Sequence, residues 1–160
     1  MTIWPLSEAR WLSSDSPDRI PCQLHFDSPL RLQARRRQSA QSWGNRELIT
    51  KPVYSTLVAS ALNRLRVYLP PDLRDQTFRF RKFLLQRAEA LPEGEWKGTI
   101  DSIHRWSTSQ QARLDLRGIV GVMDLPAGAG EFWPAMAACR WLHLGKNSTH
   151  GMGWFEGRAS

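Results

Sequence analysis

The chain has 160 residues, which is enough for one domain with its own hydrophobic core and too few for two domains of ordinary size. Hydrophobic residues make up 41% and charged residues 23% of the sequence, a balance typical of globular proteins and unlike that of disordered chains. The formal net charge is +7, and the sequence has neither a secretory signal nor the roughly 18 consecutive apolar residues of a membrane helix, so we expect a cytoplasmic protein.

The N-terminal part is predicted to contain an arm, one strand and a loop. Residues 1–21 carry three prolines and a Ser/Asp cluster, which is typical of an irregular arm. Apolar and polar residues then alternate over 22–32 with a break at Ser28-Pro29, which predicts a strand with a bulge or an edge proline. Residues 33–50 have no periodicity, so we expect a long basic loop.

Two helices are predicted next. Apolar residues recur at intervals of three and four from Val53 to Leu69, and Pro70-Pro71 ends this pattern. A second helix, rich in arginine, is expected from Phe78 to Leu91, before the breaker Pro92-Glu93-Gly94.

The C-terminal half is predicted to contain three strands and one helix. Residues 96–106 and 112–124 have the composition of two strands joined by a polar turn, residues 131–142 that of a helix, and residues 152–156 that of a short final strand. The complete order of elements is the split βαβ pattern of an α+β, ferredoxin-like domain, with an antiparallel sheet against helices. We therefore expect a single domain of this kind over residues 22–158.

Positive charge is concentrated in one part of the chain. From Arg31 to Arg87 there are 13 basic and three acidic residues, so this segment has a net charge of +10. Counterion release favours each cation placed against a nucleic-acid backbone, and the planar guanidinium of arginine binds phosphates and stacks on bases. The segment therefore favours a nucleic-acid partner; the alternative is a solvated basic face that keeps the protein soluble.

A glycine-rich loop, HLGKNSTHGMGWF, separates the last predicted helix from the last strand. Glycine accepts positive φ and has no side chain, so Gly145, Gly151 and Gly153 would let backbone N–H groups approach an anion, and Lys146 adds charge. The order of residues is neither that of a P-loop nor GxGxxG after a strand, which argues against both forms of nucleotide binding. The loop is predicted to hold a phosphate backbone.

This loop, the stretch RWSTSQQ and the Gly118-Ile119-Val120-Gly121 step in LDLRGIVGVMDL occur in an order that resembles a known family. The chain is similar, over about residues 22–157 and including the upstream FDSPLRLQ, to the C-terminal region of the CRISPR-associated endoribonucleases that process precursor CRISPR RNA, in the RAMP superfamily. The resemblance implies a RAMP domain that binds CRISPR repeat RNA. Family members typically join two such domains and cleave without metal by activating a ribose 2′-hydroxyl. Their catalytic histidine usually lies in the N-terminal domain, which this chain has no room for.

The resemblance also implies the residues of the site. RNA-binding residues are expected in the loop and in the basic segments, namely Gly145, Lys146, Asn147, Ser148, Thr149, Gly151, Gly153, Arg35, Arg36, Arg37 and Arg105. Cleavage without metal needs a proton acceptor, a proton donor and positive charge at the phosphate. His150, in the loop, is the candidate base and Lys146 its candidate assistant; the alternative is that His150 only contacts RNA or caps the loop.

The other potential reactive groups are assigned ordinary roles. His25, His104 and His143 are expected to be strand or helix-end residues. Cys22 and Cys139 have no metal-type spacing and are expected to be reduced core residues, so no metal or cofactor is predicted.

Three functions are compatible with these patterns. The chain is a metal-independent endoribonuclease, alone or as a dimer; or a non-catalytic RNA-binding subunit that joins other CRISPR-associated proteins on CRISPR RNA; or the C-terminal part of a split enzyme whose N-terminal RAMP domain is a separate chain. Cleavage of repeat RNA in EDTA would favour the first, and binding without cleavage the second.

Overall fold

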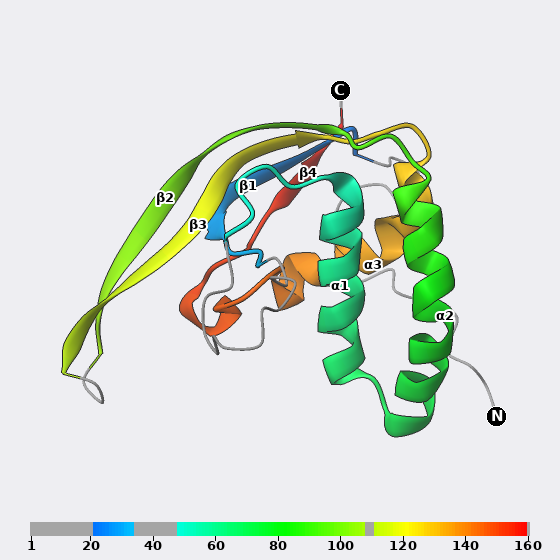
Figure 1. The fold of residues 1–160 in the computed structure, drawn as a ribbon, viewed down its shortest axis with the longest axis horizontal. Helices are drawn as coiled ribbons and strands as arrows, with labels where there is room; N and C mark the ends of the chain where they lie inside the picture. The colour runs from blue at the N-terminus through cyan, green and yellow to red at the C-terminus, as the bar shows by residue number, and fades with distance from the viewer. Residues whose placement is uncertain (1–20, 34–47, 108–110, 160) are drawn as a thin grey trace, which may run out of the picture.

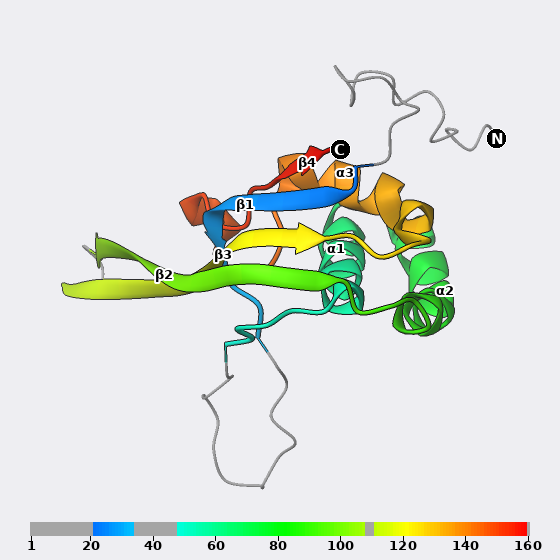
Figure 2. The same cartoon turned by 90° about the horizontal axis from the view of Figure 1, so that it is seen from above.

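In the computed structural model, which describes residues 21–33, 48–107 and 111–159, four strands form one sheet and the helices cover one of its faces (Figures 1 and 2). In chain order the elements are β1 (Gln23–Leu30), α1 (Tyr54–Tyr68), α2 (Pro71–Glu89), β2 (Glu95–Ser107), β3 (Ala112–Asp124), α3 (Trp133–Leu142) and β4 (Glu156–Arg158). The strand order is β2-β3-β1-β4, and each neighbouring pair is antiparallel. Two units, β1–α1–β2 and β3–α3–β4, therefore interleave, with α2 as an additional helix. The predicted α+β ferredoxin-like fold is confirmed.

The central strand β1 divides into two parts at its proline. Leu24 and Phe26 are fully buried against the helices, which explains the alternation in the sequence. The register of β1 against β3 then shifts between Phe26 and Leu30, as the break at Ser28-Pro29 predicts. The shift lies just before Arg31, at the end of the strand where the glycine-rich loop arrives.

The α1–α2 hairpin departs from the expected boundaries in one respect. Helix α2 begins at Pro71, seven residues before Phe78, because proline fits the first turn of a helix, where its missing N–H has no intrahelical partner. Asp72 in the same turn is favoured by the helix dipole. The two prolines that end α1 thus also begin α2.

In contrast to α2, the last two elements start later in the chain than predicted. A 3₁₀ turn, Ala129–Phe132, comes before α3, so the α-helix starts at Trp133. The prediction of a strand over residues 152–156 is wrong, because a second 3₁₀ turn at Ser148–His150 and positive φ angles at Gly151 and Gly153 keep this stretch in turns. Pairing with β1 begins only at Glu156.

The long hairpin β2–β3 belongs only partly to the body of the protein. Its two strands pair without a register shift from Glu95 opposite Asp124 to Ser107 opposite Ala112, and the ribbon extends well beyond the helices (Figure 1). The inner half of β3 supplies Ile119 to the core, which it forms with Leu57 of α1, Met136 of α3 and the apolar side of β1. The expected arm at 1–21, except Pro21, and most of the expected basic loop lie outside the described residues.

Candidate functional site

The glycine-rich loop packs against the end of β1. The amide of Lys146 donates a hydrogen bond of 2.9 Å to the Arg31 carbonyl, and the amide of Gly153 one of 3.0 Å to the Pro29 carbonyl. Gly145 and Gly153 have φ angles of +73° and +79°, and a Cβ atom on either would collide with a backbone carbonyl oxygen. Gly145 is therefore required where the loop meets the residue after β1, and Gly153 where the loop closes on its own start at Leu144.

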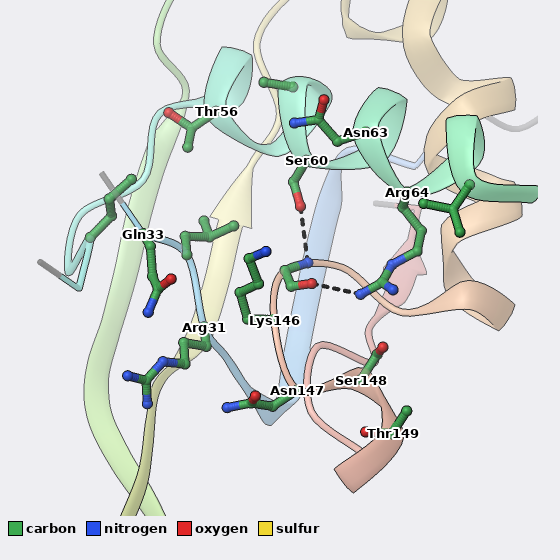
Figure 3. A pocket seen from close by; sticks show the side chains of 15 residues that line it. Arg31, Gln33, Thr56, Ser60, Asn63, Arg64, Lys146, Asn147, Ser148 and Thr149 are labelled. Carbon is green, nitrogen blue, oxygen red and sulfur yellow. Dashed lines mark hydrogen bonds between the residues drawn. The ribbon is translucent and has the colours of Figure 1, made fainter. Parts of the chain in front are cut away.

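Helix α1 holds the loop from the other side (Figure 3). Arg64 donates from Nε to the His143 carbonyl at 3.1 Å and from Nη2 to the Gly145 carbonyl at 2.6 Å. Ser60 Oγ accepts a hydrogen bond of 2.9 Å from the Gly145 amide. One turn of α1 thus binds three backbone groups of the loop. The charged Arg64 donates to the two carbonyl oxygens, and Ser60 accepts from the Gly145 amide.

The backbone of the loop does not have the role that the sequence suggested. The amides of Gly145, Lys146 and Gly153 donate to protein oxygens, so they are not available to an anion in this conformation. The expectation of a backbone cradle is wrong for these three groups. The side chains between the glycines are the other groups that the loop offers to a ligand.

These side chains form one wall of a pocket of about 500 Å³ (Figure 3). The opposite wall is α1, and the residues that follow β1 close one side. The described lining residues include three cations and no Asp or Glu; the cations are Arg31, Arg64 and Lys146. The electrostatic potential of the pocket is consequently positive, which favours an anionic ligand.

The predicted site residues divide into two groups. Pocket-lining residues are Gly145, Lys146, Asn147, Ser148 and Thr149. His150, Gly151 and Gly153 are described and lie outside the lining set, and the backbone of Arg105 lies in β2 opposite Leu114. The predicted Arg35, Arg36 and Arg37 lie outside the described residues.

Sequence reasoning missed the contribution of α1. Thr56, Ser60 and Asn63 line the pocket, and they recur at intervals of four and three, which puts them on one face of the helix. Arg31 and Arg64 entered the sequence argument only as members of the basic segment. The polar face of α1 could have indicated this pocket from the sequence. A helix face that packs directly on a loop in the core would carry apolar residues instead.

The histidines and cysteines have mostly structural surroundings. His143 Nδ1 lies 3.0 Å from the Met152 carbonyl oxygen, and His25 Nε2 lies 3.1 Å from Gln23 Oε1. His150 is exposed at the end of a 3₁₀ turn, directly after the pocket residue Thr149. Burial raises the pKa of the Cys139 thiol to about 12, while the Arg64 charge lowers it in part. A thiol with so high a pKa is a poor nucleophile.

Three further observations concern the cysteine just before β1, metal ligands and membrane helices. Cys22 is exposed, which corrects its assignment to the core. In the described part of the chain, no three His, Cys, Asp or Glu side chains cluster as metal ligands would. None of the described helices has the length and apolarity needed to cross a membrane.

A split βαβ sheet with helices on one face defines a ferredoxin-like domain, and the glycine-rich loop follows α3. The sequence model of the family "CRISPR-associated endoribonuclease Cas6" matches residues 24–155, and the chain therefore belongs to the Cas6 family. No curated protein matches the sequence directly.

Solved structures with the same fold include two Cas6 assemblies. A Cas6 product complex superimposes with a TM-score of 0.53 at 15% identity, covering 89% of this chain and 53% of that one. A partial Cas6-RT-Cas1–Cas2 complex gives a TM-score of 0.53 at 14% identity, covering 94% of this chain and 24% of that one. At this identity the similarity demonstrates the fold alone. The chain spans about half the length of the Cas6 chain in the product complex.

Proposed function

We propose that this chain binds CRISPR repeat RNA at the pocket between α1 and the glycine-rich loop, and that it takes part in processing precursor CRISPR RNA. The observation that carries the proposal is a pocket between α1 and the glycine-rich loop, whose described lining has three cations and no carboxylate, in a chain of the Cas6 family. RNA offers one phosphate per nucleotide to such a pocket, and each phosphate neutralised releases counterions.

The chemistry proposed for cleavage needs no metal. The ribose 2′-oxygen attacks the adjacent phosphorus, the bond to the 5′-oxygen of the next nucleotide breaks, and a 2′,3′-cyclic phosphate and a 5′-hydroxyl result. A base must take the 2′-proton, an acid must protonate the leaving 5′-oxygen, and a cation must stabilise the charge on the phosphorane. Lys146, exposed in the pocket wall, is suited to the last role, and His150 to proton transfer at its edge.

A second candidate is binding without cleavage, as an RNA-binding subunit or as the C-terminal part of a split enzyme. One observation favours it: His150 is not among the described residues that line the pocket. In that case a separate RAMP chain would supply the catalytic base. RNA would still bind at the same pocket.

One experiment tests both. Labelled repeat RNA is incubated with the wild-type chain and with Lys146→Ala, His150→Ala and Lys97→Ala, in EDTA, while binding is measured from 50 to 200 mM salt. Lys97 is the matched control, because it is an exposed lysine paired with Asp124 and Glu95 outside the pocket. We expect Lys146→Ala to weaken binding and to reduce the slope of log K against log salt by about one. Lys97→Ala should change neither.

The cleavage arm separates the two candidates. Metal-independent cleavage that is lost in His150→Ala supports the enzyme with its proposed base. Binding without cleavage supports the second candidate, and equal losses of affinity in Lys146→Ala and Lys97→Ala would contradict the pocket as the RNA site.

A further inference from the structure

The pocket beside the loop has the architecture of a site for a small, partly apolar ligand as well as for a phosphate. Its floor includes Leu32, Ile49 and Ala59, and its volume of about 500 Å³ is within the range of small-molecule sites. A site for phosphate alone needs no apolar floor, because a phosphate has no apolar surface to bury. The floor is therefore suited to a ligand that brings a flat or apolar part with its charge.

Both walls of the pocket carry charged and neutral polar groups. The cations Arg31 and Lys146 lie on the side of β1 and the loop, whereas Arg64 lies on α1 and is bonded to loop carbonyls (Figure 3). Neutral hydrogen-bonding groups line both walls, and those of α1 include Thr56 and Asn63. A nucleotide suits this combination, with cations for its phosphate, apolar surface for the face of its base and a hydrogen-bonding group for the edge of its base.

Asn63 is oriented by a neighbour outside the pocket. Arg81 of α2 donates a hydrogen bond of 3.2 Å from Nε to Asn63 Oδ1. Since a guanidinium has only donors, this contact assigns the oxygen end of the amide and leaves Nδ2 as the donor end. Asn63 thus offers N–H groups to a base edge that carries an acceptor, such as a carbonyl oxygen or a ring nitrogen.

We propose that the pocket takes one unstacked nucleotide of the bound RNA. Its base lies on Leu32 and Ala59, an acceptor on its edge meets Asn63 Nδ2, and its phosphate meets Arg31 and Lys146. Single-stranded RNA is recognised in this way, by bases turned out of the stack and bonded along their edges. The inference rests on the proposed function, because it assumes that the chain binds repeat RNA, and it adds that one position of that RNA is recognised through its base.

The test combines a protein variant whose pocket is partly filled with RNAs that lack one base. Ala59→Leu puts a larger side chain on the floor, and leucine is nearly as good a helix former as alanine. Ser55→Leu is the matched control, a similar change on α1 outside the pocket lining. Each variant is titrated with a series of repeat RNAs in which one nucleotide at a time is abasic.

We expect Ala59→Leu to weaken binding of intact RNA about tenfold, the size of one good base contact, and to have no further effect on the RNA that is abasic at the recognised position. Ser55→Leu should bind every RNA as the wild type does. Asn63→Asp keeps the acceptor for Arg81 but removes the donor and adds a negative charge, so it should lower the affinity for every RNA, and lower it further for RNAs that retain that base.

Two outcomes would overturn the inference. One is an Ala59→Leu effect that is the same for all abasic RNAs, as expected if the pocket held only backbone or a protein segment. The other is unchanged affinity in Ala59→Leu and Asn63→Asp. In either case salt-sensitive binding through Lys146 would leave the proposed function intact, whereas loss of all RNA binding by the wild type would remove that function itself.

Discussion

The pocket and the face of the sheet that the helices leave uncovered, here called the open face, both carry charged side chains. They differ in how these charges are balanced. On the open face, Lys97 Nζ lies 2.9 Å from Asp124 Oδ2 and 3.2 Å from Glu95 Oε2, and Arg158 lies 3.6 Å from Glu156. The pocket has cations from three separate segments, and no carboxylate among its described lining residues. The cations of the pocket are therefore available to an anionic ligand, whereas those of the open face are paired with acids.

The two regions also differ in what holds them in shape. The open face is a regular ladder, in which neighbouring strands fix the side chains. The pocket depends on a loop with positive φ angles and on the Arg64 side chain. Substitutions should consequently have larger effects on the pocket, and the following variants test this difference in order of expected size.

The largest effect is expected at Gly153. Gly153→Ala forces a Cβ atom against the Leu144 carbonyl oxygen at a φ of +79°, so we expect a loss of about 2–4 kcal/mol in the free energy of unfolding. Gly151→Ala is the control, since its φ is +77° but no atom lies within 4 Å of the added Cβ; it should lose about 1 kcal/mol. Urea titrations measure both, and equal losses would mean that the close approach to Leu144 is not what requires glycine.

Arg64 is expected to have the next largest effect. Arg64→Gln removes a charged donor from two loop carbonyls, and the free energy of unfolding should fall by about 1–2 kcal/mol. RNA affinity should also fall, but the salt slope should stay near that of the wild type, because the guanidinium is bonded to carbonyl oxygens rather than phosphate. A slope reduced as far as in Lys146→Ala would show that Arg64 contacts RNA directly.

The smallest effect is expected on the open face, at Asp124. Hydrogen bonds from Lys97 and Gln23 hold the pKa of this carboxyl below its ordinary value. Since the folded-state pKa is depressed, the stabilisation is present above the unfolded-state pKa of about 3.9 and is lost as the pH falls through the folded value. Asp124→Asn should make stability less dependent on pH below 4, with little change in RNA affinity at neutral pH. A pH dependence identical to that of the wild type would contradict the contribution of this pair.

The order of elements was predictable from the sequence because it depends on local signals. Periodicity identified α1, and the two prolines after it identified its end. The start of α2 was missed because Pro71 was taken only as a helix terminator, although proline is equally suited to a first turn. The last strand was predicted too early in the chain. The apolar residues around Gly153 suggested a strand, but the positive φ angles of Gly151 and Gly153 keep that stretch in turns.

The site was less predictable than the fold. The loop and Lys146 were identified, since glycine spacing and charge are visible in sequence. The partnership of Arg64 with the loop was not, because its two acceptors are backbone carbonyls, and every residue has one. Only packing determines which carbonyls turn toward an arginine, so contacts of this kind have no sequence signature.

The contacts that close the pocket also bear on how the chain folds. Arg64 and Gly145 are 81 residues apart, and Ser60 and Gly145 are 85 apart, whereas the α1–α2 and β2–β3 hairpins join neighbouring segments. Because loop closure disfavours distant contacts, the hairpins should form early and the pocket late. A nascent or truncated chain lacking its last residues would have helices and a ribbon but no pocket. Competence to bind at this site should therefore arise only when the C-terminal segment has docked, after the two hairpins have formed.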